Sequence, residues 1–223
     1  MNDKKSPFAV HVRALRAPAF FIALSLIPIL AGIFRLVKVA SGEATSHDDV
    51  RFLNSALPVV LHIGASIAFI ILGAFQFHEG LRKARPRWHR RAGWVATVAG
   101  VLSATTGIWM TLAYDIPVRL QGGLLIGARL LVGSGMAAFL LLAIASIRRR
   151  DVRNHRAWMM RAYALGLGAG SQAVLFLLPA PFVGEITGFP RDVLLAVSWL
   201  LNLLIAEFLI RNRHLKGSVE LQG

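Results

Sequence analysis

Residues 61–110 read LHIGASIAFIILGAFQFHEGLRKARPRWHRRAGWVATVAGVLSATTGIWM. Two apolar runs lie here on either side of a turn rich in Arg and Lys. With its flanking residues, each run reaches the length of about 20 residues that a helix needs to cross a bilayer. Because lipid offers the backbone no hydrogen-bond partners, each run must form a helix that satisfies its own peptide groups. This part of the chain therefore predicts a helical membrane hairpin.

The rest of the chain repeats this pattern. Of the 223 residues, 56% are hydrophobic and 16% are charged, and the mean hydropathy is +0.60, which is too high for a soluble domain. We predict an all-α polytopic membrane protein, with a transmembrane domain over 17–210 between two short tails, 1–16 and 211–223. Its six predicted spans are 17–40, 56–78, 92–114, 122–146, 157–179 and 190–210.

The basic residues predict the orientation. The formal net charge is +14, and 19 of the 25 Lys and Arg residues fall in the two tails, the second connection and the fourth connection with the helix start that follows it. By the positive-inside rule, both termini are expected in the cytoplasm of a bacterium, with the chain in its inner (plasma) membrane. The expected partners of these segments are the anionic lipids of the inner leaflet. Nucleic acid is not an expected partner, because no basic domain exists outside the spans.

Several classes of chemistry are excluded by residues that the chain lacks. It has no Cys, which excludes disulfides, thiolate metal sites, iron–sulfur clusters and thiol nucleophiles. It has no glycine-rich phosphate loop, HExxH or GxSxG motif. Any chemistry is therefore expected within the helix bundle or on a bound cofactor, and whether the protein is an enzyme stays open.

A short internal repeat relates two of the predicted turns. His89-Arg90 before the third span is repeated 66 residues later by His155-Arg156 before the fifth. We therefore expect spans two–three and four–five to be parallel-related hairpins that form the core. In the third span, small residues recur at Gly93, Gly100 and Gly107. They indicate close helix packing or clearance for a cofactor, and such stripes also permit a homodimer.

Polar side chains at membrane depth are candidate functional residues, because burying them in lipid is costly. His62, Arg129 and Gln172 each lie roughly 10 Å from the outer end of a predicted span, at 1.5 Å per residue. They are expected to form one polar layer. The layer is either a site for a ligand, a quinone or a haem edge, or a hydrogen-bond network that braces the bundle. A ligand there would be anionic, because Arg129 has no acidic residue near it within the spans.

A second polar layer is predicted at the cytoplasmic end. His78, His89 and His155 lie at three helix ends, with Gln76 at a similar depth. His89 and His155 are candidate ligands of a metal ion or of haem iron, and His78 and Gln76 are candidate cofactor contacts. The alternative is that these side chains contact lipid headgroups. Glu207, inside the sixth span, is expected to form a structural ion pair with Arg161 or Arg211.

Four segments resemble a known family: LHIGASIAFIILGAFQF (61–77), WHRRAGW (88–94), RRRDVRNHRAWMMRAYAL (148–165) and SWLLNLLIAEFLIR (198–211). Over residues 56–211 the chain resembles the DUF2306 family of predicted bacterial membrane proteins. The residues that carry the resemblance are His62, Gln76, His89, His155, Arg161, Asn202 and Glu207. The family implies an integral membrane protein but no activity. The histidine-bearing hairpins are also similar, in architecture alone, to b-type membrane cytochromes of the cytochrome b561 kind.

Two functions from different classes follow as expectations. The first is a redox or electron-transfer component that binds haem b or quinone and works with a membrane redox partner. The second is a non-enzymatic small transporter or assembly factor in which the outer polar layer binds a small anion or a lipid headgroup.

Overall fold

The computed structural model of the protein describes the backbone of residues 7–42 and 49–219, and the side chains of 15–42, 49–179 and 181–212. Within these ranges the structure is helical and contains no strand, which confirms the predicted all-α class. Helices extend into both predicted tails. Residues 1–6 and 220–223 of those tails, and residues 43–48 of the first connection, lie outside the described residues.

Within the described residues, five helices are long and apolar enough to cross a membrane, as predicted for five of the six spans. They are α1 (Pro7–Ser41), α3 (Ala56–Gln76), α5 (Pro86–Ala113), α6 (Gly123–Arg148) and α10 (Gly188–Val219). Shorter helices lie between them: α2 (Val50–Asn54), α4 (Glu79–Ala84), α7 (Val152–Gly166), α8 (Gly168–Leu177) and α9 (Ala180–Val183).

The predicted span 157–179 is not one continuous helix. It consists of α7 and α8, which meet at Leu167 between two glycines, the residues that favour a helix least after proline. Asn202 of α10 spans the break, because its Nδ2 donates to the Ala164 carbonyl at 3.1 Å and to Ser171 Oγ at 2.9 Å. The backbone therefore keeps a partner where the helix ends at membrane depth. Six uninterrupted spans are not confirmed.

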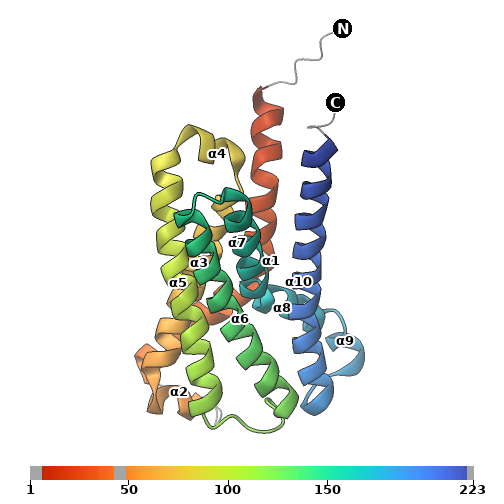
Figure 1. Cartoon of the computed structure of the whole chain (residues 1–223). Helices are drawn as coiled ribbons and strands as arrows, with labels where there is room; N and C mark the ends of the chain where they lie inside the picture. The colour runs from red at the N-terminus through yellow and green to blue at the C-terminus, as the bar shows by residue number, and fades with distance from the viewer. Residues whose placement is uncertain (1–6, 43–48, 220–223) are drawn as a thin grey trace.

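The long helices form a bundle (Figure 1). Helix α3 packs along α5, α6 packs along α7, and α5 joins the two pairs, as expected for a core of two hairpins. Helix α1 lies against α3 and α8, and α10 lies against α6, α7 and α8. Helix α8, the second part of the broken span, therefore lies between α1 and α10.

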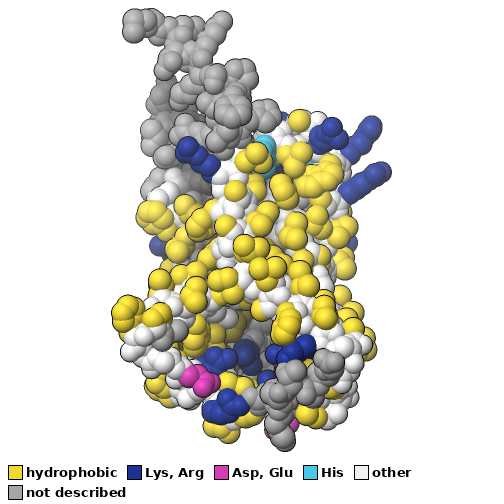
Figure 2. All heavy atoms as spheres, turned by 180° about the vertical axis from the view of Figure 1, so that it is seen from behind, with side chains coloured by type: hydrophobic (Ala, Val, Ile, Leu, Met, Phe, Trp, Pro, Cys, Tyr) yellow, Lys and Arg dark blue, Asp and Glu magenta, His cyan; other side chains and the backbone are white. Residues whose placement is uncertain are grey.

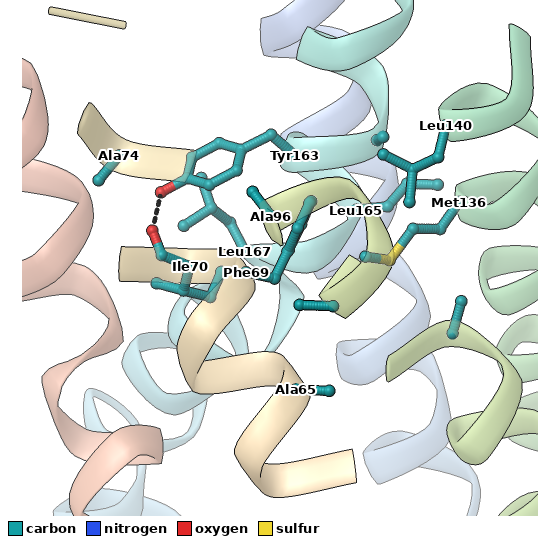
Figure 3. Packing of buried hydrophobic residues seen from close by; sticks show 13 residues of the cluster. Ala65, Phe69, Ile70, Ala74, Ala96, Met136, Leu140, Tyr163, Leu165 and Leu167 are labelled. Atoms are coloured by element: carbon teal, nitrogen blue, oxygen red, sulfur yellow. Dashed lines mark hydrogen bonds between the residues drawn. The ribbon is translucent and has the colours of Figure 1, made fainter. Parts of the chain in front are cut away.

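The buried core lies where α3, α5, α6 and α7 meet (Figure 3). Phe69 and Leu140 are almost completely buried there, and the Tyr163 hydroxyl donates to the Ile70 carbonyl at 2.9 Å. A Cβ added at Gly100 would lie 2.8 Å from both Phe69 and Leu140. This glycine of the α5 stripe therefore serves close helix packing.

The basic segments gather at one end of the bundle. Figure 1 places the start of α1, the α4 connection, the α6–α7 turn and the end of α10 at the same end. We call this the basic end. The opposite end, with α2, the α5–α6 loop and α9, is called the α2 end. The two ends separate the candidate site residues into two groups.

Candidate functional site

Two cavities lie at different depths in the bundle. The α2-end cavity has a volume of about 470 Å³ and lies between α1, α3, α5, α6, α8 and α10. The basic-end cavity has a volume of about 320 Å³ and lies between α3, α5 and α7. Both volumes fall within the range of about 300–1,000 Å³ that is usual for ligand pockets.

The α2-end cavity brings together His62, Arg129 and Gln172, the three residues of the predicted outer layer. Nδ1 of His62 lies 2.9 Å from the Ser103 carbonyl. Because a carbonyl only accepts hydrogen bonds, Nδ1 carries the proton and Nε2 keeps its lone pair. A Cβ added at Gly107 would lie 3.2 Å from the His62 ring, so this glycine of the α5 stripe makes room for the imidazole.

Arg129 and Gln172 each have a neutral protein partner. Arg129 donates to Gln121 Oε1, and Gln172 Nε2 donates to the Leu195 carbonyl at 3.3 Å. The nearby carboxylate of Asp192 is only 2% exposed and accepts instead from the Gly122 and Leu125 amides, at 3.2 and 3.3 Å. It thereby caps the start of α6. Among the described residues, no carboxylate forms an ion pair with Arg129.

Sequence reasoning missed two further arginines of this cavity, Arg51 and Arg191. The Arg51 guanidinium lies 4.8 Å from the Phe52 ring centroid, and that of Arg191 lies 5.3 Å from the Phe176 ring centroid. Figure 2 shows a hollow near the α2 end with Lys and Arg side chains inside it. Their positions in the sequence could have indicated them. Both arginines occur in connections on the predicted outer side, where the positive-inside pattern leaves few basic residues.

Tyr114 lines the same cavity at the end of α5. Its hydroxyl donates to the Ser55 carbonyl at 2.6 Å and so ties the end of α5 to the start of α3.

The basic-end cavity brings together His89, His155 and Gln76. His89 is the fourth residue of α5 and His155 is the fourth residue of α7. The backbone amide of each donates to the residue just before its helix, Arg85 or Asp151, at 3.1 and 3.0 Å. The 66-residue repeat therefore places the two imidazoles at equivalent helix positions, and both line one cavity.

The ring nitrogens of the two histidines differ in their partners. Nδ1 of His155 lies 2.9 Å from the Ala143 carbonyl, so it donates and leaves Nε2 with a lone pair. Nδ1 of His89 is buried and has no hydrogen-bond partner among the described residues, and the same is true of Gln76 Nε2. Buried polar atoms of this kind are rare in folded proteins and indicate a missing partner. A Cβ added at Gly93 would lie 3.3 Å from Gln76 Oε1.

Asp151 fixes the start of α7 and with it the position of His155. Its carboxylate accepts from the Asn154 backbone amide at 3.0 Å and from Asn154 Nδ2 at 2.6 Å. These hydrogen bonds hold the pKa of Asp151 below its ordinary value, so the cap is ionised at neutral pH.

The structure places His78 outside both cavities. It is the N-cap of α4, and its Nδ1 accepts from the Leu81 amide at 2.8 Å. The His78 side chain is therefore used to begin a helix and does not lie beside His89 and His155, although all three were expected at one depth.

Glu207 and Arg161 form the predicted ion pair. The Glu207 carboxylate accepts from Arg161 Nε and, at 2.9 Å, from Arg161 Nη2. The guanidinium also lies 4.5 Å from the Trp158 ring centroid. This two-point contact joins α7 to α10 on the basic-end side of the Leu167 break, and the side chains are 20% and 28% exposed.

Three comparisons with known proteins bear on identity. No curated protein and no solved structure matches the chain significantly. A family model described as "Predicted membrane protein (DUF2306)" matches residues 59–210. The match covers most of the chain and includes both cavities' histidines and the Arg161–Glu207 pair, so it confirms the resemblance carried by those residues. The chain belongs to the DUF2306 family of predicted membrane proteins.

Proposed function

We propose that this membrane protein is a redox component that would hold haem b in the basic-end cavity, with His89 and His155 as the residues that would bind its iron. The observation that carries the proposal is the donor set of this cavity: two imidazoles, from α5 and α7, of which His89 has a buried Nδ1 without a hydrogen-bond partner among the described residues. Neutral imidazole is a common ligand of haem iron.

This donor set fits haem better than a bare metal ion. A bare Zn²⁺ takes three or four protein ligands. Within the described part of the chain, no group of three or more His, Cys, Asp or Glu side chains is close enough together to hold an ion. Haem iron is bound mainly by its porphyrin and would need few protein ligands, which the two histidines of this cavity could supply.

The rest of the lining suits the apolar ring and the charged propionates of a haem. Apolar and aromatic walls are supplied by Phe69, Trp94 and Tyr163. Three arginines, Arg82, Arg90 and Arg156, also line the cavity. The porphyrin is larger than a cavity of about 320 Å³. We therefore expect its propionate edge to extend to the arginines of the lining. Arginine binds carboxylates through charge-assisted hydrogen bonds.

The chain's own residues would orient and tune such a group. The Ala143 carbonyl fixes the tautomer and the ring plane of His155, as outer-shell partners of ligating histidines usually do. Helix α7 is held in place by the Asp151 cap at its start and by the Arg161–Glu207 pair further along the helix. Bound haem supplies one-electron transfer.

The orientation is part of the proposal: the basic end faces the cytoplasm and the protein lies in the bacterial inner membrane. The gathering of four basic segments at one end supports it, because such segments are retained on the cytoplasmic side and attract anionic lipids. Reporter fusions at the C-terminus and within 82–85 should give a cytoplasmic signal, and a fusion within 184–187 an external one. A cytoplasmic signal from 184–187 would contradict this orientation.

The haem proposal predicts the composition of the purified protein. After expression with haem supplied and extraction in mild detergent, the protein should show b-type absorption bands and contain close to one haem per chain by the pyridine haemochromogen assay. A matched preparation of an unrelated six-span protein controls for haem carried along in the detergent. Protein that stays free of haem through expression and through direct reconstitution would overturn the proposal.

A further inference from the structure

The α2-end cavity has a basic outer part and an apolar inner part. Along α3 its wall runs from His62 to Ile70, with Ile63, Ile67 and Ile70 on one helix face. Along α5 the cavity extends from Tyr114 to Ser103, which is roughly 16 Å at 1.5 Å per residue. A ligand that fills it would need a polar head and an apolar body.

The charge of the outer part is of one sign. Arg51, Arg129 and Arg191 line the cavity, and none of its lining residues is Asp or Glu. A nearby carboxylate, Asp192, accepts hydrogen bonds from the amides that begin α6. Cationic side chains within a membrane usually pair with an acid or line a site for an anion. Among the described residues no carboxylate forms an ion pair with Arg129, and the single charge of nearby Asp192 does not balance the three arginines of the lining. The lining is therefore basic and complementary to an anionic group.

The hydrogen-bonding groups of the lining suit such a head. The planar guanidinium of Arg129 donates to Gln121 through one nitrogen, and its remaining N–H groups suit two oxygens of a carboxylate or phosphate. His62 presents its lone pair at Nε2, so it can accept from a protonated phosphate oxygen. Deeper in the cavity Met136 and Leu165 complete an apolar lining.

We infer that the α2-end cavity is a binding site for an amphiphile with an anionic oxygen headgroup, a carboxylate or a phosphate, whose hydrocarbon tail lies along α3 toward the core. This site is separate from the proposed haem site and does not rest on it. The inference selects a lipid-like anion over a free inorganic anion, because the apolar inner part of the cavity would otherwise be left unfilled.

The test is equilibrium binding of radiolabelled decanoate to the full chain in nanodiscs of zwitterionic phosphatidylcholine, with empty nanodiscs as the background. We expect saturable binding at one site per chain. Decyl phosphate should compete, whereas inorganic phosphate, decanol and the neutral decylubiquinone should compete at least tenfold more weakly. Arg129→Gln should weaken binding by about tenfold or more, the usual effect of losing a hydrogen bond to a charged group.

Arg119→Gln is the matched control, because Arg119 lies at the same end, is 53% exposed and does not line the cavity. If Arg129→Gln does not fold, Arg191→Gln replaces it. Equal binding by the Arg129 variant, equal competition by decanol or decylubiquinone, equal competition by inorganic phosphate, or no saturable binding would each overturn the inference. Haem content, measured on the same samples, tests the haem proposal for the basic-end cavity. Failure of one proposal is therefore distinguishable from failure of the other.

Discussion

Replacing His155 by alanine is expected to lower haem occupancy to below about a tenth of the wild-type value. The substitution removes one of the two proposed axial ligands, and loss of an outer-shell partner alone costs about 10–100-fold in metal affinity. It also frees the Ala143 carbonyl of its hydrogen bond, which should cost only about 1 kcal/mol of folding stability. The measurement is haem per chain after identical expression and purification, and His89→Ala is expected to behave in the same way.

His78→Ala provides a matched control for the loss of an imidazole at the basic end. His78 caps α4 and lines neither cavity, so the variant should keep the haem of the wild type. If the His89 and His155 variants both retained full haem, the axial ligands would lie elsewhere. Loss of haem in all three variants to the same degree would indicate a general effect on folding.

Replacing Glu207 by alanine is expected to lower the free energy of unfolding by about 3 kcal/mol. The change leaves the Arg161 guanidinium, 20% exposed and inside the bundle, without its carboxylate partner. Removing one member of such a partly buried pair costs more than the pair contributes, because an uncompensated charge remains. The measurement is reversible unfolding in mixed micelles, followed by the circular dichroism of the helices.

Glu79→Ala is the matched control for this prediction. Glu79 pairs with Arg82 at 3.8 Å on the surface, where its side chain is 63% exposed, so its loss should change stability by about 0–1 kcal/mol. The double variant Arg161→Met/Glu207→Leu should recover much of the loss, because both charges are removed together. Equal effects of Glu207→Ala and Glu79→Ala would show that the Arg161–Glu207 pair does not brace the bundle.

The spanning helices were predictable because membrane depth imposes a simple rule, a run of about 20 apolar residues. The exception is the break at Leu167. Hydropathy averaged over 157–179 does not distinguish one helix from two, and the break depends on partners distant in sequence. Asn202 satisfies the Ala164 carbonyl, and Trp199 packs where a side chain at Gly168 would have to be.

The candidate sites were predictable in part, because the depth of a residue in the membrane can be counted along its span. Depth counted along each span placed His62, Arg129 and Gln172 at one level, and the structure brings them to one cavity. Depth says nothing about direction, which is why His78 was grouped with His89 and His155 although its ring turns to cap α4. The additional arginines, Arg51 and Arg191, come from a short helix and a helix start whose placement depends on the folded bundle.

The central claim, that His89 and His155 hold haem iron between them, is tested most directly by the electron paramagnetic resonance spectrum of the oxidised protein. With both imidazoles as axial ligands, the ferric iron should be low-spin with a bis-histidine signature, and His89→Ala and His155→Ala should each convert any residual haem to a high-spin form. A wild-type protein that binds haem in a high-spin state, or whose low-spin signal is unchanged in both variants, would contradict the claim.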